Sequence, residues 1–456
     1  MEQRKFGVRD QFGYMLGDIG GSFVNLYIGS FFLLFATYVL GVSPYFMGTL
    51  FLVARIFDAF TDVVMGSIPD KYQIGKSGNR FLPYISIAKW FLAASLLLSF
   101  ADVSNFSSTA IHIWVVAVYL FYGIAYTADS IPYGSLAAVI TRDPVERTKL
   151  SRARAVGGMI VGIGALSLVP MFIYDNNGEI IPKAFFNIAI VFSILSLLSY
   201  TGLVKLTTER VKEPAKNKVD YKFTEALKAA LTNRPLIGVM IASIGSLIII
   251  NGVNQLAAIV FAEYYHMPSA FAINSYVNIS IIVILFIIVP KLVKTFGKRN
   301  LVIFSSTFSL LAMICMTIFT VENVYLFIAL YNISTIGLSI FVMVVWALVT
   351  DCLDYTELQI GKRYDGTIFS IYSFSRKVGM GVGSALGSYS LGWVGFVSGQ
   401  SSQSAEVATS VLKLYNGLPI IAFVLIVIGI TVVFNLDNQK TNAMYETLEN
   451  NRMSIE

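Results

Sequence analysis

The chain has 456 residues, of which 56% are hydrophobic and only 13% are charged, and its mean hydropathy is +0.70. Soluble domains carry about 25% charged residues, so the composition excludes an ordinary soluble protein and indicates a polytopic membrane protein. The net charge of +6 lies in short segments between apolar stretches and indicates no nucleic-acid partner, and the two cysteines and two histidines offer neither a disulfide framework nor a zinc or haem site.

Windows of about 20 apolar residues, the length needed to cross a bilayer, predict twelve transmembrane helices. No cleavable signal peptide is expected, because the start MEQRKFGVRDQF is polar and the first apolar run is too long. The approximate limits of the twelve spans are 11–40, 44–68, 82–101, 110–138, 154–174, 184–206, 235–263, 268–292, 300–321, 324–350, 366–396 and 413–435.

The distribution of lysine and arginine predicts the orientation in the membrane. An even number of spans places both termini on one side, and the segments on that side carry nearly all the basic residues outside the spans. The opposite loops hold only Lys183 and Lys413. Since basic loops remain on the cytoplasmic side, we expect a plasma-membrane protein with both termini in the cytoplasm.

The charged segment 207–234 divides the chain into two six-helix bundles, 1–206 and 235–435, and a tail, 436–456, follows them. The loops after the second and eighth spans, DKYQIGKSGNR and KTFGKRN, both combine glycine with basic residues. Two six-helix halves are typical of the major facilitator superfamily, in which the substrate site lies near the midplane between the halves. We therefore predict an all-α major facilitator fold.

Three charged residues, Arg55, Asp58 and Asp62, lie inside the second predicted span. Their spacing of three and four residues places them on one face of a helix. A charge inside a membrane helix costs about 2.5–3.5 kcal/mol on insertion scales and usually faces a polar cavity. Two carboxylates one turn apart can share a small cation or a proton. The alternative is a structural ion pair between Arg55 and one aspartate.

Further polar residues lie within other predicted spans. Arg152 and Arg154 open the fifth span, and the fourth span carries YTADSIPYGSL, whose proline frees backbone carbonyls for other contacts. Helix-packing hydrogen bonds remain an alternative role for the aspartates. The polar candidates in these spans are Asp18, Tyr126, Thr127, Asp129, Ser130, Arg154 and Lys377.

Three motifs resemble those of the glycoside–pentoside–hexuronide cation symporters. They are RIFDAFTDVVMGSIPDK, YTADSIPYGSLAAVITRDPVERTKLSRAR and TDCLDYTELQIGKRYDGTIFS, and the resemblance covers the chain from Gly13 to the last span. The resemblance implies transport of a glycoside together with H⁺ or Na⁺, with no other cofactor and no enzymatic activity. It also implies a chain that works in the lipid bilayer, and we expect a monomer.

The resemblance also implies roles for individual residues. Asp58 and Asp62 would bind the cation, with Thr127 adding a hydroxyl oxygen. Asp18 and Arg154 would bind sugar hydroxyls. The remaining substrate-site candidates are Tyr126, Asp129, Ser130, Ser373 and Lys377, with Lys377 between the sugar and cation sites, and the cytoplasmic gate candidates are Asp351, Asp354, Glu357 and Arg363.

The sequence departs from the melibiose permease of this family at two positions. Ser130 stands where that permease has its second sugar-binding aspartate, and Asp129 is shifted by one residue, about 100° around the helix. Gly134 stands where the permease has a stacking tryptophan. IPYGSL is closer to the glucuronide and xyloside carriers, so a galactoside is not expected. No appended phosphotransferase-like domain is expected after Glu456.

Two other classes of function are compatible with a polytopic membrane protein. A lipid or drug carrier of the same superfamily would need a wide apolar cavity rather than paired Asp and Arg side chains. A membrane enzyme would need a nucleophile–base or metal constellation, and a non-transporting sensor would need neither. The chain has no GxxxxGK[ST] loop, which argues against an ATP-driven pump.

Overall fold

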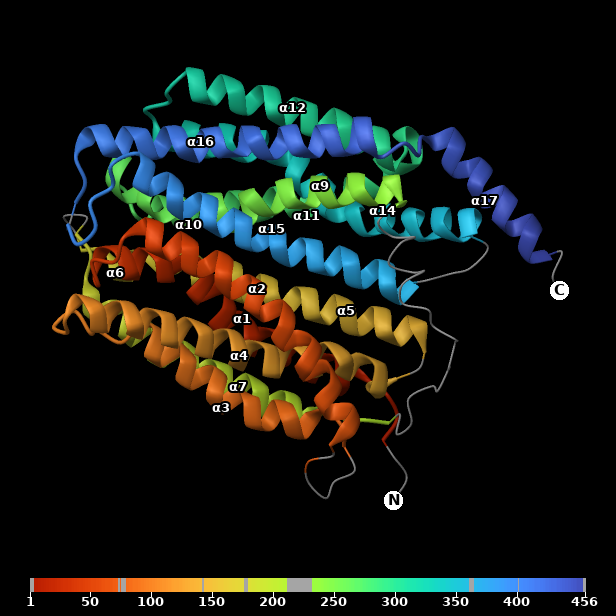
Figure 1. The fold of residues 1–456 in the computed structure, drawn as a ribbon, viewed down its shortest axis with the longest axis horizontal. Helices are drawn as coiled ribbons and strands as arrows, with labels where there is room; N and C mark the ends of the chain where they lie inside the picture. Colours follow the sequence, from red (N-terminus) through yellow and green to blue (C-terminus); the bar gives the residue numbers. More distant parts are fainter. Residues whose placement is uncertain are drawn as a thin grey trace. The chain divides into compact units, whose positions relative to one another are not determined.

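Long α-helices make up most of the computed structural model (Figure 1). It describes residues 4–72, 74, 79–141, 143–175, 179–210, 232–360, 365–400 and 402–453. In these ranges the only β-pairing is an isolated bridge between Tyr174 and Ile180. The helices of the N-terminal half are α1 (Val8–Tyr38), α2 (Pro44–Lys71), α3 (Leu82–Ser99), α4 (Ser108–Ile140), α5 (Pro144–Met159), η1 (Ile160–Ala165), η2 (Leu166–Leu168), α6 (Pro170–Ile173) and α7 (Pro182–Leu206).

The C-terminal half is also helical and contains several π-helical turns, which commonly occur as local bulges in longer helices. Its elements are α9 (Arg234–Leu247), η3 (Ile248–Val253), α10 (Asn254–Ile259), η4 (Val260–Tyr264), α11 (Ala270–Phe296), α12 (Lys298–Ile318), α13 (Val324–Ser334), α14 (Ile336–Ile360), α15 (Asp365–Trp393), α16 (Ala405–Ile428), η5 (Gly429–Val433) and α17 (Asn438–Met453).

Ten helical stretches in the described ranges are long and apolar enough to cross a membrane. Two more long helices, α2 with 28 residues and α15 with 29, fall outside this set. Charged residues inside these two helices lower their hydropathy: Arg55, Asp58 and Asp62 in α2, and Arg376 and Lys377 in α15. The ten stretches and these two helices together match the twelve predicted spans.

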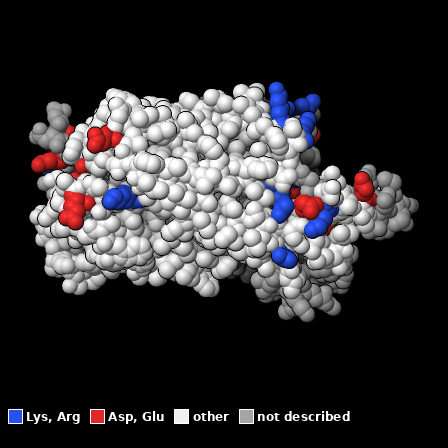
Figure 2. Space-filling model, turned by 90° about the horizontal axis from the view of Figure 1, so that it is seen from above, with Lys and Arg blue, Asp and Glu red and all other residues white. Residues whose placement is uncertain are grey.

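The surface also fits a membrane setting. On the face shown in Figure 2, Lys, Arg, Asp and Glu side chains lie toward the two ends, and the broad band between them shows none. Burying a charge in hydrocarbon is unfavourable, so an uncharged band is the surface that a lipid bilayer requires.

Two predicted helix limits are wrong. The helix that contains the fifth span begins at Pro144, because Asp143 accepts a hydrogen bond from the Glu146 amide at 3.1 Å and caps the polar first turn. The candidate span itself begins at Lys149 rather than 154. Arg154 therefore lies within the helix rather than at its start. The last span begins at Ala405 rather than 413, so Lys413 lies inside α16 and not in a loop.

The described helices separate into two compact units. Unit 1 comprises Met1–Asn217 with two short segments, His266–Ala272 and Gly395–Ser404. Unit 2 comprises Lys218–Tyr265, Ile273–Val394 and Ala405–Glu456. The functional candidates of the first and second halves therefore belong to different units.

In unit 1, α1 packs against α5 and α7, and α3 packs against α4 and α7. The core is aromatic: Tyr27, Phe31 and Phe35 of α1 are fully buried. Tyr27 donates a hydrogen bond to the Phe185 carbonyl of α7 at 3.0 Å. In the core of a membrane protein such a bond satisfies a hydroxyl that has no water to bind.

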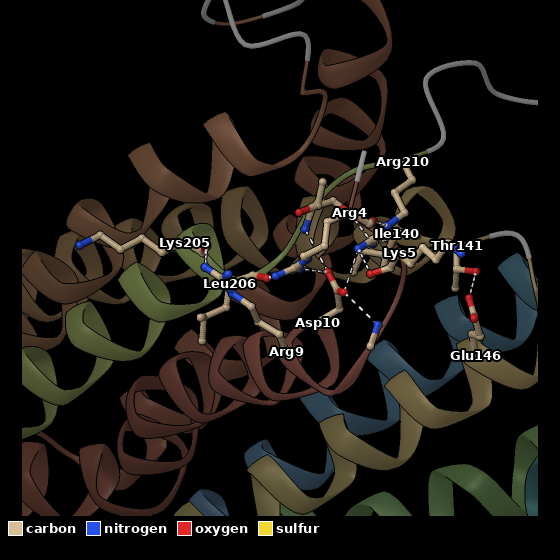
Figure 3. Close-up of polar contacts among 12 residues, drawn as sticks. Arg4, Lys5, Arg9, Asp10, Ile140, Thr141, Glu146, Lys205, Leu206 and Arg210 are labelled. Atoms are coloured by element: carbon tan, nitrogen blue, oxygen red, sulfur yellow. Dashed lines mark hydrogen bonds and ion pairs between the residues drawn. The ribbon is translucent and has the colours of Figure 1, made fainter. Parts of the chain in front are cut away.

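A buried ion cluster fastens α1 at its N-terminal end, and we call it the Asp10 anchor. Asp10 is fully buried and accepts from Arg4 at 2.7 Å and from Arg210 at 2.9 Å. The amides of Gly7 and Thr208 add hydrogen bonds at 3.2 and 3.3 Å. Figure 3 shows Arg4 and Arg210 converging on Asp10. The carboxylate joins the start of α1 to the segment that follows α7.

Arg210 extends this anchor to α4. Its guanidinium donates to the Ile140 carbonyl at 3.3 Å, and its amide donates to the Val139 carbonyl at 2.8 Å. The same guanidinium donates to the carbonyls of Arg4 and Lys5. Arg210 thus connects the segment before α1 and the start of α1 with the end of α4.

Glu209 holds α3 in the same way. One of its carboxylate oxygens accepts from the amides of Phe81 and Leu82, both at 2.8 Å, and the other accepts from the Arg80 amide at 2.6 Å. These amides belong to the start of α3, where the helix has no internal partners for them. A negative charge there also interacts favourably with the helix dipole.

We expect Glu209→Gln to destabilise the protein by about 1–3 kcal/mol, because the new amide nitrogen faces a backbone N–H and the charge on the helix end is lost. A lowered melting temperature of the purified protein in detergent is the measurement. Glu446→Gln on α17 is the matched control, since Glu446 is exposed. Equal melting temperatures for the two variants would contradict the capping role.

Candidate functional site

Two aspartates of α2, Asp58 and Asp62, lie one turn apart on the helix face that contacts α4. Thr127 donates a hydrogen bond to Asp62 at 2.9 Å. One turn earlier, Gly123 faces Asp58, and a Cβ at Gly123 would lie only 2.6 Å from the Asp58 carboxylate oxygen. Glycine at that position therefore leaves the space that the carboxylate occupies. The predicted cation residues Asp58, Asp62 and Thr127 lie on these two facing helices.

Arg55 belongs to the same group. Its guanidinium pairs with Asp58 at 3.1 Å, and the two side chains are 15% and 12% exposed. This is the ion pair that the sequence offered as the alternative to a cation site. This pair gives Asp58 a counter-charge, and Thr127 gives Asp62 a hydrogen bond. Both aspartates offer carboxylate oxygens, the type of ligand that hard cations prefer.

Asp18 of α1 and Arg154 of α5 form the second polar group of unit 1. They pair at 3.0 Å, and the Arg154 side chain is 48% exposed while that of Asp18 is 17% exposed. Ser22, one turn along α1, donates to Asp18 at 3.5 Å. An exposed guanidinium beside a carboxylate presents donors and an acceptor together, which suits hydroxyl groups of a ligand.

Two tyrosines support this pair. The Arg154 guanidinium lies over the ring of Tyr133, 5.2 Å from its centroid. Tyr133 stacks on Tyr14 of α1, with ring centroids 4.7 Å apart, and donates to the Tyr14 carbonyl at 2.7 Å. Cation–π contact and stacking fix the direction in which Arg154 points.

Asp129 lies elsewhere on α4. It is buried and accepts a short hydrogen bond from the Tyr200 hydroxyl of α7. Its neighbour Ser130 is partly exposed, as is Tyr126, whose ring lies 5.9 Å from that of Tyr122. The one-residue shift between Asp129 and Ser130 therefore separates an interior carboxyl group from a partly exposed hydroxyl group.

The substrate candidates of unit 2 lie on α15. Ser373 is exposed and Lys377, one turn later, is partly exposed, so both share one face of this helix. The predicted contact of Lys377 with the carboxylates of unit 1 stays a prediction.

The gate candidates lie at the end of α14. Asp351 is buried and pairs with Lys298, at the start of α12, at 2.5 Å. Tyr445 of α17 also donates to Asp351 at 2.5 Å. Asp354 and Glu357 follow on the same helix, one and two turns later. Arg363 lies outside the described residues.

The Asp351–Lys298 pair lines a cavity of about 240 Å³ between α12, α14 and α17, within unit 2. Burial and the hydrogen bond to Asp351 raise the pKa of Tyr445. Its hydroxyl therefore stays protonated at neutral pH and keeps donating to the carboxylate. This hydrogen bond connects the tail helix α17 to Asp351, one of the gate candidates.

Several residues around these groups were not predicted: Gly123, Tyr133, Tyr200 and Lys298. Gly123 and Tyr133 lie one turn before Thr127 and one turn after Asp129, so helical spacing from known candidates could have found them. Lys298 lies in the predicted loop KTFGKRN, where the sequence gives no reason to choose one basic residue over another. Tyr200 is one of many aromatic residues in an apolar span and carries no such signal.

In the described part of the chain, long apolar helices that carry ion pairs between them are typical of a polytopic membrane protein. The chain belongs to the family described as MFS/sugar transport protein, whose model matches residues 13–438. This confirms the predicted resemblance to the glycoside–pentoside–hexuronide symporters and the major facilitator fold. The protein is a secondary transporter of the sugar-symporter class and not an enzyme.

Relatives match the chain over nearly its whole length. The uncharacterized symporter YjmB of Bacillus subtilis (strain 168) is 30% identical over 96% of this chain and 94% of its own. The glucuronide carrier protein homolog of Escherichia coli (strain K12) is 27% identical over 91% and 90% of the two chains. The isoprimeverose transporter of Lactiplantibacillus pentosus is 27% identical over 91% and 86%.

Solved structures share the fold. A bacterial homolog of the human lysosomal transporter Spinster superposes with a TM-score of 0.68 at 12% identity, over 96% of this chain and 97% of that one. The xylose transporter XylE from E. coli superposes with a TM-score of 0.58 at 14% identity, over 97% and 98%. At these identities the similarity concerns the fold alone.

Proposed function

We propose that the protein carries a glycoside together with a monovalent cation, H⁺ or Na⁺, by alternating access. One observation carries this proposal: unit 1 contains two distinct polar groups on neighbouring helices, Asp62–Thr127 and Asp18–Arg154. The first offers oxygens to a cation, and the second offers donors and an acceptor to hydroxyl groups. A symporter needs both kinds of site close enough to influence each other.

The proposed substrate class rests on the Asp18–Arg154 pair and on the names of the relatives. The relatives named as a glucuronide carrier homolog and an isoprimeverose transporter support a glucuronide, a xyloside or a related oligosaccharide. Gly134 leaves no aromatic ring at the position where the melibiose permease has one, which disfavours a galactoside. Tyr126, Asp129, Ser130 and Ser373 complete the proposed substrate-site residues.

Two sets of residues would couple the two units: Lys377 near the binding sites, and the cytoplasmic gate candidates. Lys377 would neutralise the acidic groups of unit 1 when the cation site is empty, since an ammonium group inside a membrane needs an anion or water. Asp351, Asp354, Glu357 and Arg363 would form ion pairs that open when substrate is released toward the cytoplasm. The bundles 1–206 and 235–435, joined by 207–234 and followed by the tail 436–456, would move against each other.

The distribution of basic residues supports a plasma-membrane protein with both termini in the cytoplasm. One chain contains candidates for the cation site, the sugar site and the gate, so a monomer is sufficient for transport.

Uptake into proteoliposomes tests this function. A labelled glucuronide, xyloside and galactoside are compared, each with an imposed pH gradient, an imposed Na⁺ gradient or neither. We expect one of the first two sugars to accumulate above equilibrium with one of the gradients, and Lys377→Val to lose this accumulation. Equilibration that is indifferent to both gradients would exclude symport, and no sugar flux at all would favour a lipid or drug carrier.

A further inference from the structure

Lys89 is a buried lysine inside a membrane-spanning helix of unit 1. It lies in α3, and 8% of its surface is exposed. Its ammonium group donates a hydrogen bond to the Thr201 hydroxyl of α7 at 2.9 Å and lies 5.6 Å from the centre of the Trp90 ring. Among the described residues no carboxylate pairs with this ammonium group, whereas Arg55 and Arg154 of the same unit each pair with an aspartate.

The face of α7 beside Lys89 changes from apolar to polar along its length. Ile194 and Leu198 are exposed, with 53% and 62% of their surface accessible. Thr201 and Lys205 follow at helical spacing, so the four side chains share one face of α7. In a membrane the apolar part of this face contacts acyl chains, and the polar part lies nearer the end of α7, on the side where both termini are proposed to lie.

Two further cations lie at the same end of α7. Lys205 is exposed in the last turn of the helix and is close enough to Lys89 for their charges to interact. The guanidinium of Arg9, which is also exposed, donates to the Lys205 carbonyl at 3.5 Å. Figure 3 shows the Lys205 side chain extending away from the Asp10 anchor. Since like charges repel, a bound anion would stabilise this group.

The contacts of Thr201 define what Lys89 can still bind. The Thr201 hydroxyl donates to the Leu197 carbonyl at 2.6 Å, so its oxygen is the acceptor for Lys89. An ammonium group carries three donors, and Thr201 takes one of them. In the ranges that the structure describes, no other hydrogen-bond acceptor reaches Lys89. Thr201 therefore orients the ammonium group and leaves donors for a ligand.

The position of Lys89 along α3 fits the edge of the hydrocarbon region. At about 1.5 Å per residue, Lys89 lies roughly 10 Å from the start of α3, and helical side chains point back toward the helix start. Trp90 is 62% exposed, and tryptophan is enriched at the membrane–water interface. A helix-packing bond to Thr201 accounts for the direction of Lys89 but supplies no counter-charge, and an ammonium group inside a membrane needs an anion or water.

We propose that Lys89 and Lys205 bind the phosphate of an anionic phospholipid in the cytoplasmic leaflet, with its acyl chains along Ile194 and Leu198. Each ammonium group donates to a phosphate oxygen, and the lipid joins α3 to α7. The choice of leaflet rests on the proposed orientation of the chain. The site is separate from the proposed sugar and cation sites.

The surroundings of the two lysines favour a lipid over a free phosphate ion. A free ion at this level would lose much of its hydration, because exposed apolar residues, Ile194 and Leu198, continue along the same face of α7. A phospholipid already holds its phosphate at the interface and its acyl chains in hydrocarbon, so its binding requires no such transfer. Basic side chains near the cytoplasmic surface attract anionic lipids of that leaflet.

Tryptophan quenching by brominated lipids tests the site, with Trp90 as the reporter. The full chain is reconstituted in phosphatidylcholine bilayers that contain a rising fraction of phosphatidylglycerol with brominated acyl chains, which quench tryptophan at short range. A parallel series uses brominated phosphatidylcholine. The difference between wild type and Trp90→Phe gives the Trp90 signal. We expect phosphatidylglycerol to quench this signal at a fraction about 5-fold or more below that of phosphatidylcholine.

Substitution of the two lysines assigns the preference to this site. Lys205→Gln should reduce it by about 5-fold, the equivalent of about 1 kcal/mol for one basic residue near an anionic lipid. Lys89→Met keeps the apolar stem and should reduce it by at least as much, whereas Lys89→Arg keeps the charge and should retain it. Lys183→Gln is the matched control, because Lys183 is exposed at the other end of α7, and it should leave the preference unchanged.

Three outcomes would overturn the proposal. Equal quenching of Trp90 by the two brominated lipids in wild type would show that no lipid is selected there. An undiminished preference in Lys205→Gln, whose exposed side chain can change without disturbing the core, would show that the preference arises elsewhere. Relief of the quenching by inorganic phosphate in the buffer would identify a site for the free ion. No step depends on sugar transport, so failure of this site and failure of the symport function are distinguishable.

Discussion

Asp62→Asn is expected to abolish accumulation of the sugar against its gradient, while exchange of labelled for unlabelled sugar across the membrane continues. Asp62 is the carboxylate of the α2 group that receives the Thr127 hydroxyl, and Asp58 beside it is paired with Arg55. Amide substitution removes the negative charge that would balance a bound cation. The carrier would then bind and reorient with sugar but gain no driving force from the ion gradient.

The measurement compares gradient-driven uptake with counterflow in the same proteoliposomes. Thr127→Ser is the matched control, since it keeps the hydroxyl, and it should accumulate sugar nearly as well as wild type. Thr127→Ala removes one hydrogen bond, worth about 0.5–1.5 kcal/mol, and should weaken the apparent cation affinity by roughly 2- to 12-fold. Full accumulation by Asp62→Asn would remove this carboxylate from the coupling mechanism.

Arg154→Ala is expected to weaken sugar binding by roughly 10- to 150-fold, the equivalent of one charge-assisted hydrogen bond of about 1.5–3 kcal/mol. Arg154 is half exposed, paired with Asp18 and directed by the ring of Tyr133. It is therefore positioned to donate to a ligand rather than to stabilise the fold. Asp18→Ala should have a similar effect, because the ligand loses an acceptor and Arg154 loses its orientation.

Calorimetry on the purified variants measures this loss directly. Arg152→Ala is the control, because Arg152 is an exposed arginine on the same helix, two residues away and on a different face. Arg154→Lys keeps the charge without the planar donor fork and should bind with intermediate affinity. Affinity in Arg154→Ala equal to that in Arg152→Ala would show that the sugar binds elsewhere.

Much of the fold could be predicted because membrane helices have a strong sequence signal. Hydropathy locates twelve spans, and helical spacing alone places Asp58 and Asp62 on one face. The errors occur where polar residues begin a helix, as at Pro144 and Ala405, because the apolar window detects the hydrocarbon segment and not the start of the helix.

Partners across helices were harder to predict. The sequence indicates that Asp129 departs from the family pattern, but only the packing of α4 on α7 shows that Tyr200 is its partner. Likewise, Asp10, Glu209 and Arg210 lie near predicted span ends and look like ordinary surface charges in the sequence. Their roles depend on which helix ends meet, and a hydropathy pattern does not contain this information.

The Asp10 anchor has a mechanical consequence. In the described part of the chain, its partners lie between Arg4 and Arg210. In a carrier whose halves move against each other, tension in the connecting chain enters unit 1 at Arg210. The contacts of Arg210 and Glu209 would distribute this tension over α1, α4 and α3. The end of α7 would then not carry the tension alone.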